Sequence, residues 1–149
     1  MKSLFDTSAH TELLERIENI QENSIPLWGE MNAAKMFAHC CGPLKVSLGK
    51  LELEKPNFMM KFMLSFFRTS LYDDKPWKKG LPTTKEYKIT QDTNFGNSKK
   101  ELIDLINEFH AKKDQTTWPV HPYFGSFTPE QWGMMQYKHL DHHFTQFGV

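Results

Sequence analysis

The sequence has little cysteine, no long hydrophobic run and no excess of charge of either sign. Its two cysteines, Cys40 and Cys41, are adjacent, and neighbouring helical residues point about 100° apart, which excludes an ordinary disulfide between them. Eighteen basic and eighteen acidic residues cancel, so the cationic field of a typical nucleic-acid-binding protein is absent. The longest apolar stretch, residues 58–67, is far shorter than the roughly 20 residues of a membrane span.

These absences also bear on compartment and size. A chain without pairable cysteines suits a reducing compartment, and the first ten residues, MKSLFDTSAH, hold no apolar core of the length that a signal peptide needs. The sequence therefore predicts a soluble, cytoplasmic protein with no nucleic-acid or membrane partner. Its 149 residues suffice for one core and not for two, so a single domain over residues 1–149 is expected.

What the sequence does contain is helical periodicity. Five segments combine a helix-start signal with apolar residues: residues 7–20 (N-cap Thr7 or Ser8), 33–48 (N-cap Asn32), a short segment after Pro56, a segment opened by the capping box Ser98-x-x-Glu101, and residues 128–147 (Thr128 followed by Pro129). No segment strongly indicates a strand. The fold class is therefore all-α, an antiparallel four-helix bundle with an extra short helix.

Residues 71–96 interrupt this pattern with prolines, glycines and many polar residues. They predict a long irregular connection with at most one short strand-like piece. A connection of this length often forms the lid or wall of a site.

Three of the seven histidines lie in the last predicted helix, at positions 139, 142 and 143. At 100° per residue, His139 and His143 stand about 40° apart, and both share the apolar stripe of Trp132. His142 falls at the rim, and Lys138 falls on the far side of the helix. Two imidazoles four residues apart on a helix can bind one divalent ion, so His139 and His143 are candidate metal ligands.

A third ligand must come from another helix. His39, in the middle of the second predicted helix, faces the core from the opposite wall. Pro43 leaves the carbonyl of His39 without its helical donor, so a kink or loosened turn is expected there. Cys40 is the rival ligand, and its alternative role is that of a small core residue. Three imidazoles with an open fourth position are typical of a catalytic zinc site, whereas histidines without a metal can satisfy one another or a backbone carbonyl.

Four segments that cover about half the chain resemble the DinB/YfiT-like superfamily, specifically a subfamily of small uncharacterised proteins: WGEMNAAKMFAHCCGPL (28–44), LPTTKEY (81–87), KKELIDLINEF (99–109) and HPYFGSFTPEQWGMMQYKHLDHHFTQFG (121–148). The resemblance implies an antiparallel four-helix bundle in which three histidines hold a divalent metal, one on the second helix and two on the last. They correspond to His39, His139 and His143, the residues that the helical wheel selects. The resemblance also implies a homodimer.

Some members of this superfamily use the metal to activate a low-molecular-weight thiol. The resemblance therefore implies a transferase in which zinc or nickel supports attack of a small thiol on a small electrophile. A metal-dependent hydrolase is the close alternative, and a non-enzymatic metal- or small-ligand-binding module is an alternative of a different class. His121, before the last helix, is a candidate general acid or base, and its alternative role is structural, in the turn that Pro122 and Gly125 favour.

The aromatic residues have two predicted roles. Trp28, Trp118 and Trp132 are expected to pack in the core or at its rim. The apolar residues of the short third helix exceed what such a helix needs to bury on one side: Phe58, Met59, Phe62, Met63, Phe66 and Phe67. They either plug the open end of the bundle or form part of a subunit interface.

Overall fold

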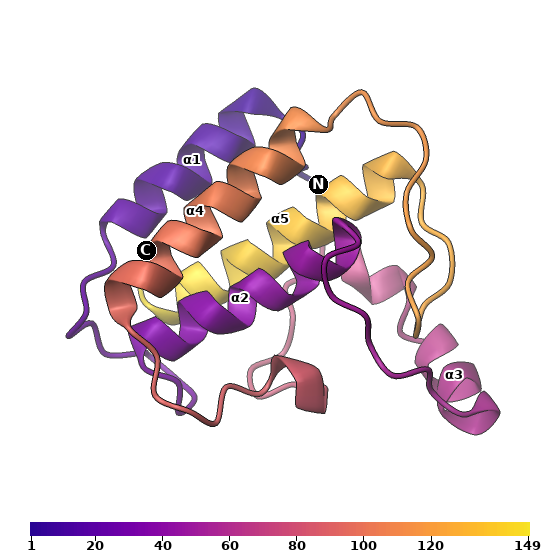
Figure 1. The fold of residues 1–149 in the computed structure, drawn as a ribbon, viewed down its shortest axis with the longest axis horizontal. Helices are drawn as coiled ribbons and strands as arrows, with labels where there is room; N and C mark the ends of the chain where they lie inside the picture. The colour runs from indigo at the N-terminus through magenta and orange to yellow at the C-terminus, as the bar shows by residue number, and fades with distance from the viewer.

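The computed structural model describes all of residues 1–149 and contains helices but no sheet (Figure 1). The helices are α1 (Thr7–Glu18), α2 (Ala33–Ser47), α3 (Phe58–Ser65), α4 (Phe95–Ala111) and α5 (Pro129–Gln146), with two 3₁₀ turns, η1 (Thr69–Leu71) and η2 (Lys85–Tyr87). The β pairing is limited to an isolated bridge between His121 and Gly125. The predicted all-α class is confirmed, and residues 71–96 form an irregular connection without a strand, as predicted. None of the helices is both long and apolar enough to cross a bilayer.

The four long helices form the bundle, and two run in each direction (Figure 1). Each of α1 and α2 contacts both α4 and α5, so α1 and α2 lie on one diagonal. The neighbours α2 and α4 run parallel, as do α1 and α5, while the other two neighbouring pairs are antiparallel. A parallel neighbour requires a connection that returns along the bundle, and residues 48–94, which include the predicted irregular connection, make that return between α2 and α4.

The predicted helix starts are confirmed for α2 and α5. The side chain of Asn32 accepts a hydrogen bond from the backbone N–H of Lys35 at 2.9 Å, which satisfies one of the free donors of the first turn. Thr128 and Gln131 form a reciprocal capping box at α5. Helix α2 continues through Pro43 to Ser47.

Two other predicted starts are wrong. Helix α1 is preceded by Asp6, rather than capped by Thr7 or Ser8, and it ends at Glu18. Helix α4 begins at Phe95, because the side chain of Asn94 accepts from the N–H of Asn97 at 2.9 Å and caps the helix one turn before the expected box. Ser98 lies inside the helix and is buried against the bundle.

The core lies between the apolar stripes of the four long helices. Its largest fully buried side chains include Leu13, Ile17, Met36, Phe37, Leu44, Leu102, Ile106, Phe109, Trp132 and Phe144. Full burial of one such Leu, Ile or Phe side chain contributes about 1.5–3 kcal/mol. The bundle is thus a rigid frame for polar groups that lie between α2 and α5.

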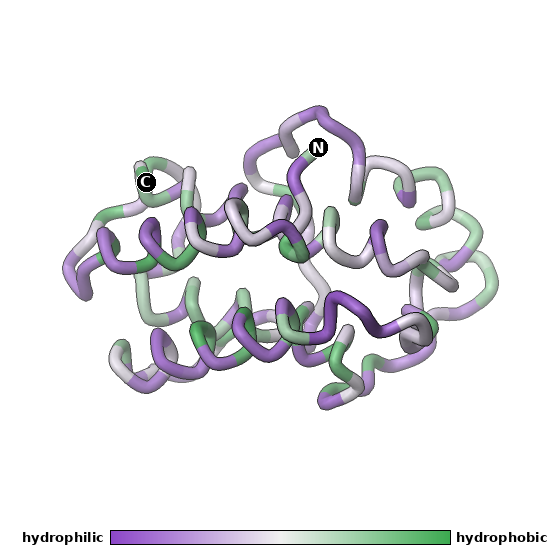
Figure 2. Tube along the Cα trace, turned by 90° about the horizontal axis from the view of Figure 1, so that it is seen from above, coloured by the Kyte–Doolittle hydropathy of each residue, from purple (hydrophilic) through white to green (hydrophobic).

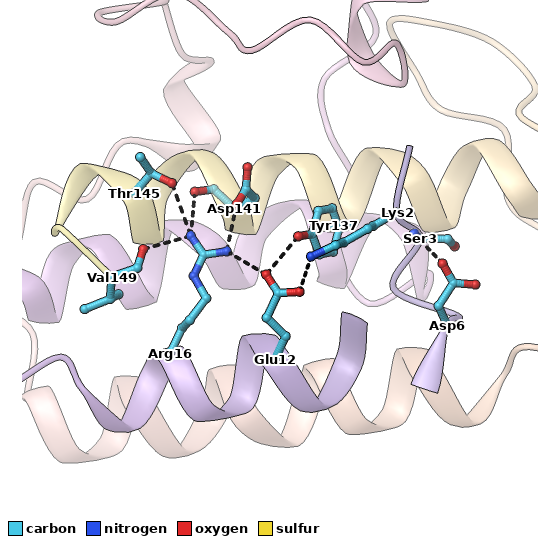
Figure 3. Close-up of polar contacts among 9 residues, drawn as sticks. All are labelled: Lys2, Ser3, Asp6, Glu12, Arg16, Tyr137, Asp141, Thr145 and Val149. Atoms are coloured by element: carbon cyan, nitrogen blue, oxygen red, sulfur yellow. Dashed lines mark hydrogen bonds and ion pairs between the residues drawn. The ribbon is translucent and has the colours of Figure 1, made fainter. Parts of the chain in front are cut away.

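A polar cluster fixes α5 against α1 (Figure 3). The guanidinium of Arg16 donates to the carboxylate of Asp141 at 2.7 Å, to the hydroxyl of Thr145 at 3.1 Å and to the carbonyl of Val149 at 2.9 Å. One turn earlier, the hydroxyl of Tyr137 donates to Glu12 at 3.1 Å. Because these contacts span three turns of α5, they set both its rotation and its position along the bundle.

Helix α3 stands apart from the bundle, and Figure 2 shows a hydrophobic stretch at the same end of the molecule. None of its residues is buried, and Phe58 and Phe66 are 87 % and 70 % exposed. The alternative that this helix plugs the open end of the bundle is therefore wrong.

Candidate metal centre

Three histidines converge between α2 and α5. His39 comes from the middle of α2, and His139 and His143 lie one turn apart on α5. Each offers one ring nitrogen, and the three nitrogens lie within 4.8 Å of one another. The Nε2 atoms of His39 and His139 are 3.2 Å apart, and the three residues are between 5 and 9 % exposed. The structure thus brings together the three residues that the sequence predicted as ligands.

Two of the rings are held by hydrogen bonds at their outer nitrogen. His39 Nδ1 donates to the backbone carbonyl of Tyr87 at 2.9 Å. His143 Nδ1 donates to the side-chain oxygen of Gln146 at 2.9 Å, and the amide of Gln146 is itself oriented because its nitrogen donates to the carbonyl of Trp28 at 2.6 Å. A neutral imidazole that donates through Nδ1 has a lone pair on Nε2, so both rings are set to accept a metal through Nε2.

The third ring differs. His139 Nδ1 is buried and has no hydrogen-bond partner. Without an ion, His139 Nε2 donates to the lone pair of His39 Nε2 across their 3.2 Å contact. To bind an ion through Nε2, His139 must carry its proton on Nδ1 instead. The three histidines therefore form hydrogen bonds at every ring nitrogen facing outward except His139 Nδ1. Leaving this buried nitrogen without a partner costs free energy, which a purely structural cluster would not be expected to carry.

All three rings are kept neutral. Burial lowers the pKa of His143 to about 3, with a further contribution from neighbouring His39. Burial, together with repulsion from His143 and His39, holds the pKa of His139 well below its usual range. Burial also lowers the pKa of His39, although its bond to the Tyr87 carbonyl acts in the opposite direction. Neutral imidazole is the form that binds metals, so the site is ready for an ion at pH 7.

Two glycines make these hydrogen bonds possible. A Cβ at Gly42 would lie 2.6 Å from the ring of Tyr87, so only glycine lets Tyr87 lie across α2 and present its carbonyl to His39. Gly29 has a φ of +80°, and a Cβ there would lie 2.6 Å from the side-chain nitrogen of Gln146. Both close approaches support the outer hydrogen bonds of ligand rings rather than the rings themselves.

The irregular connection contacts two of the three histidines. The ring of Tyr87 stands edge-on to His39, with 6.1 Å between ring centres, and the ring of Trp77 lies 6.0 Å from that of His139. Lys138, predicted to lie on the far side of its helix, is buried there, because residues 70–73 cover it: its ammonium group donates to the carbonyl of Ser70 and to the carbonyl and carboxylate of Asp73. The wheel predicted the direction of Lys138 but not the segment that covers it.

The structure places the remaining candidates elsewhere. His121 is buried among the aromatic rings of Phe124, Phe127 and Trp132, and it accepts a hydrogen bond from the N–H of Tyr123 at 3.2 Å. None of its contacts is with the three histidines. Cys40 is fully buried and its thiol donates to the sulfur of Met36, so it acts as a small core residue and is not part of the ligand set.

Three residues at the site were not predicted from sequence: Tyr87, Gln146 and Trp77. Gln146 follows His143 by three residues, a helical spacing that brings two side chains together and that the sequence displays. Tyr87 lies in the segment LPTTKEY, where resemblance to the superfamily was the only signal. Nothing in the local sequence indicates that Trp77 reaches His139.

The donor set fits a transition-metal ion. A zinc ion with bonds of about 2.0–2.1 Å to nitrogen in tetrahedral geometry requires nitrogens about 3.3 Å apart, and the observed separations range from near this value to 4.8 Å. Three imidazoles without a carboxylate suit zinc, nickel, copper or iron rather than magnesium or calcium.

The comparisons with known proteins identify a family. The family described as "Protein of unknown function (DUF1569)" matches residues 2–148 of the chain. No curated protein and no solved structure matches the chain significantly.

Proposed function

The chain belongs to the DUF1569 family, a family with the DinB-like fold, and we propose that His39, His139 and His143 bind one divalent ion through Nε2. The observation that carries this proposal is the convergence of three buried, neutral imidazoles, two of which are fixed by outer hydrogen bonds. Three protein ligands leave a fourth position open, which distinguishes a reactive site from a closed structural one. Zinc and nickel are the expected ions.

The reaction that this arrangement supports is transfer of a small thiol to a small electrophile. A divalent ion at the site lowers the pKa of a thiol or water molecule at its open position and stabilises the resulting anion. In the transfer, the sulfur forms a bond to the electrophilic carbon, the leaving group departs with its electron pair, and the thiol proton passes to solvent. The protein's own part is to hold three neutral rings and to exclude bulk water from them, since they are at most 9 % exposed.

A metal-dependent hydrolase uses the same site with water in place of the thiol. The structure places no carboxylate or histidine other than His142 in ring contact with the ligand histidines, and His142 lies at the rim, 5.2 Å from His143 between ring centres. Because a thiol gives up its proton more readily than water does, its attack depends less on a neighbouring general base, and the thiol reaction is therefore favoured. His121 remains a candidate only through a rearrangement of its aromatic surroundings.

The experiment that tests the function uses purified protein loaded with zinc or nickel. Several low-molecular-weight thiols are assayed against 1-chloro-2,4-dinitrobenzene, and we expect turnover that depends on the ion and is lost on chelation. The matched control is His10→Ala, a histidine on α1 that contacts Asn107 and His110 and none of the ligand histidines, and its turnover should equal that of the wild type. Turnover of a model ester without any thiol would favour the hydrolase. A stoichiometric ion without turnover in either assay would favour the alternative of a binding module.

We further propose that the protein works as a homodimer in the cytoplasm, with residues 1–149 as one domain. Helix α3 supports the dimer, because seven large apolar residues on the helix and directly after it are between 47 and 87 % exposed. They are Phe58, Met59, Met60, Phe62, Met63, Phe66 and Phe67. At about 200 Å² for each such side chain, their exposed area is on the order of 800 Å², comparable to one side of a standard interface. The two buried, free cysteines support a reducing compartment.

A further inference from the structure

The indole of Trp77 lies beside two histidines of α5, the candidate metal ligand His139 and its neighbour His142. Its ring centre is 6.0 Å from that of His139 and 5.7 Å from that of His142. An ion about 2.1 Å from His139 Nε2 would lie about 3 Å from the centre of that ring, and so within about 9 Å of the indole centre. Since van der Waals contact begins about 3.5–4 Å from the ring, a group that extends about 5 Å from the ion reaches Trp77.

A buried lysine holds this indole in place. The ammonium group of Lys138 donates to the carbonyl of Ser70 at 2.7 Å, to the carbonyl of Asp73 at 2.8 Å and to the carboxylate of Asp73 at 2.5 Å. These three acceptors satisfy all of its donors, which a buried ammonium requires. The indole N–H of Trp77 donates to the same carbonyl of Ser70 at 2.7 Å. Lys138 and Trp77 are therefore joined through one oxygen atom.

A second indole lies near the same histidine. The ring centre of Trp28 is 5.8 Å from that of His142, so the imidazole of His142 contacts both indoles. Lys138 directly precedes His139 in the sequence, so a single turn of α5 carries a metal ligand and the anchor of the wall. The flat face of an indole favours contact with a flat apolar group.

We propose that Trp77 contacts the group bound at the open position of the metal centre and that Lys138 is its positioning residue. The site thereby selects ligands whose metal-binding atom carries an aromatic ring. The inference rests on the proposed metal binding, and it names the substrate class of that same site: small thiols with an aromatic group next to sulfur.

The test measures ligand binding to the protein loaded with Co²⁺, a spectroscopic substitute for zinc. Thiophenol and ethanethiol are titrated separately, and their dissociation constants are read from the visible absorption of the cobalt site. The preference for thiophenol is the ratio of the ethanethiol to the thiophenol dissociation constant. The intrinsic difference between the two thiols is the same for every variant, so a change in this ratio between wild type and variant measures the contribution of the substituted residue to the preference. The variants are Trp77→Ala with Trp77→Phe as its conservative partner, and Lys138→Met with Lys138→Arg.

We expect Trp77→Ala to reduce the preference for thiophenol about tenfold while ethanethiol and Co²⁺ bind as in the wild type. Trp77→Phe should retain most of the preference. Lys138→Met should lose the preference for thiophenol, whereas Lys138→Arg should keep it. A general structural defect at this position would not distinguish the two variants in this way. Preference unchanged in Trp77→Ala overturns the inference, and preference unchanged in Lys138→Met alone overturns the positioning role. A wild type that binds Co²⁺ without preferring thiophenol overturns this inference and leaves the metal centre intact, whereas a wild type that binds no Co²⁺ overturns both.

Discussion

His39 donates from Nδ1 to the carbonyl of Tyr87 at 2.9 Å, across 48 residues of sequence. This bond ties a ligand on α2 to the irregular connection and selects the tautomer in which Nε2 faces the other two histidines. Outer hydrogen bonds of this kind orient metal ligands, and their loss typically reduces metal affinity 10–100-fold. The connection is therefore part of the candidate metal centre and not only a link between helices.

Substitution of Gly42 by alanine should displace Tyr87. A helical glycine replaced by alanine normally stabilises a helix by about 0.5–1 kcal/mol, but here the new Cβ would lie 2.6 Å from the Tyr87 ring. We expect zinc affinity to fall at least tenfold, as measured by competition with a chromophoric chelator. The matched control is Gly96→Ala, whose Cβ makes only an ordinary 3.5 Å contact. Equal zinc affinities in the two variants would contradict the role of Tyr87.

The ion itself should be lost when His139 is changed to alanine. Elemental analysis of gently purified, reloaded protein should give close to one divalent ion per chain in the wild type and none in His139→Ala, because two remaining imidazoles hold an ion weakly. His142→Ala, a histidine substitution on the same helix outside the ligand set, should retain the ion. His39→Ala should weaken binding without unfolding the bundle, and loss of the folded circular dichroism spectrum there would instead assign the ion a structural role.

The helical wheel predicted the site because the spacing of His139 and His143 depends only on local helix geometry, and their shared stripe with Trp132 points inward. The third residue, His39, was accessible because its helix has clear start and end signals. The parallel packing of α2 beside α4 was not predicted, since helix direction depends on how a long connection returns. That return needs residues 48–94, whose composition indicates only an irregular segment.

The same limitation explains the errors in detail. Lys138 has a polar side chain on the side of α5 opposite the core, so periodicity predicts exposure, and only the path of the connection buries it. Asn94 and Ser98 are both good N-cap residues, and the sequence does not say which of two starts one turn apart is used. Local sequence patterns thus do not determine the burial of Lys138 or the first residue of α4, because both depend on tertiary contacts.

Replacement of Arg16 by methionine should destabilise the bundle. Its guanidinium donates to Asp141, Thr145 and Val149, and the side chain is only 15 % exposed. Removal of these charged hydrogen bonds should reduce the free energy of unfolding by about 2 kcal/mol, as measured by urea denaturation of metal-free protein. Lys100→Met, in an exposed pair with Asp104 on α4, is the control and should change stability by less than about 0.5 kcal/mol. Similar losses in both variants would show that the Arg16 contacts contribute little.

Acid should destabilise the metal-free protein in part through His121. Burial lowers the pKa of this residue from 6.5 to about 4. Below pH 6.5 this histidine is therefore protonated in the unfolded chain and stays neutral in the folded protein. Each unit by which the pH falls, down to about pH 4, lowers the free energy of unfolding by up to about 1.4 kcal/mol. His121→Asn has no such proton, so its free energy of unfolding should decrease by roughly 2 kcal/mol less than that of the wild type between pH 7 and pH 5. Parallel pH profiles in urea denaturation would contradict the neutral, buried state of His121.

Helix α3 should hold the proposed dimer together. Phe62, on α3, and Phe66, which caps the end of α3, are 58 % and 70 % exposed, and their ring centres are 5.1 Å apart. Replacing both by serine removes two aromatic side chains from an interface of standard size, so we expect the dissociation constant of the dimer to rise at least a hundredfold in sedimentation equilibrium. Lys61→Ser, at the exposed position that directly precedes Phe62 and that carries no apolar group, is the matched control and should leave the dimer intact. A wild type that sediments as a monomer at every concentration would show that α3 does not bind a second copy of the chain.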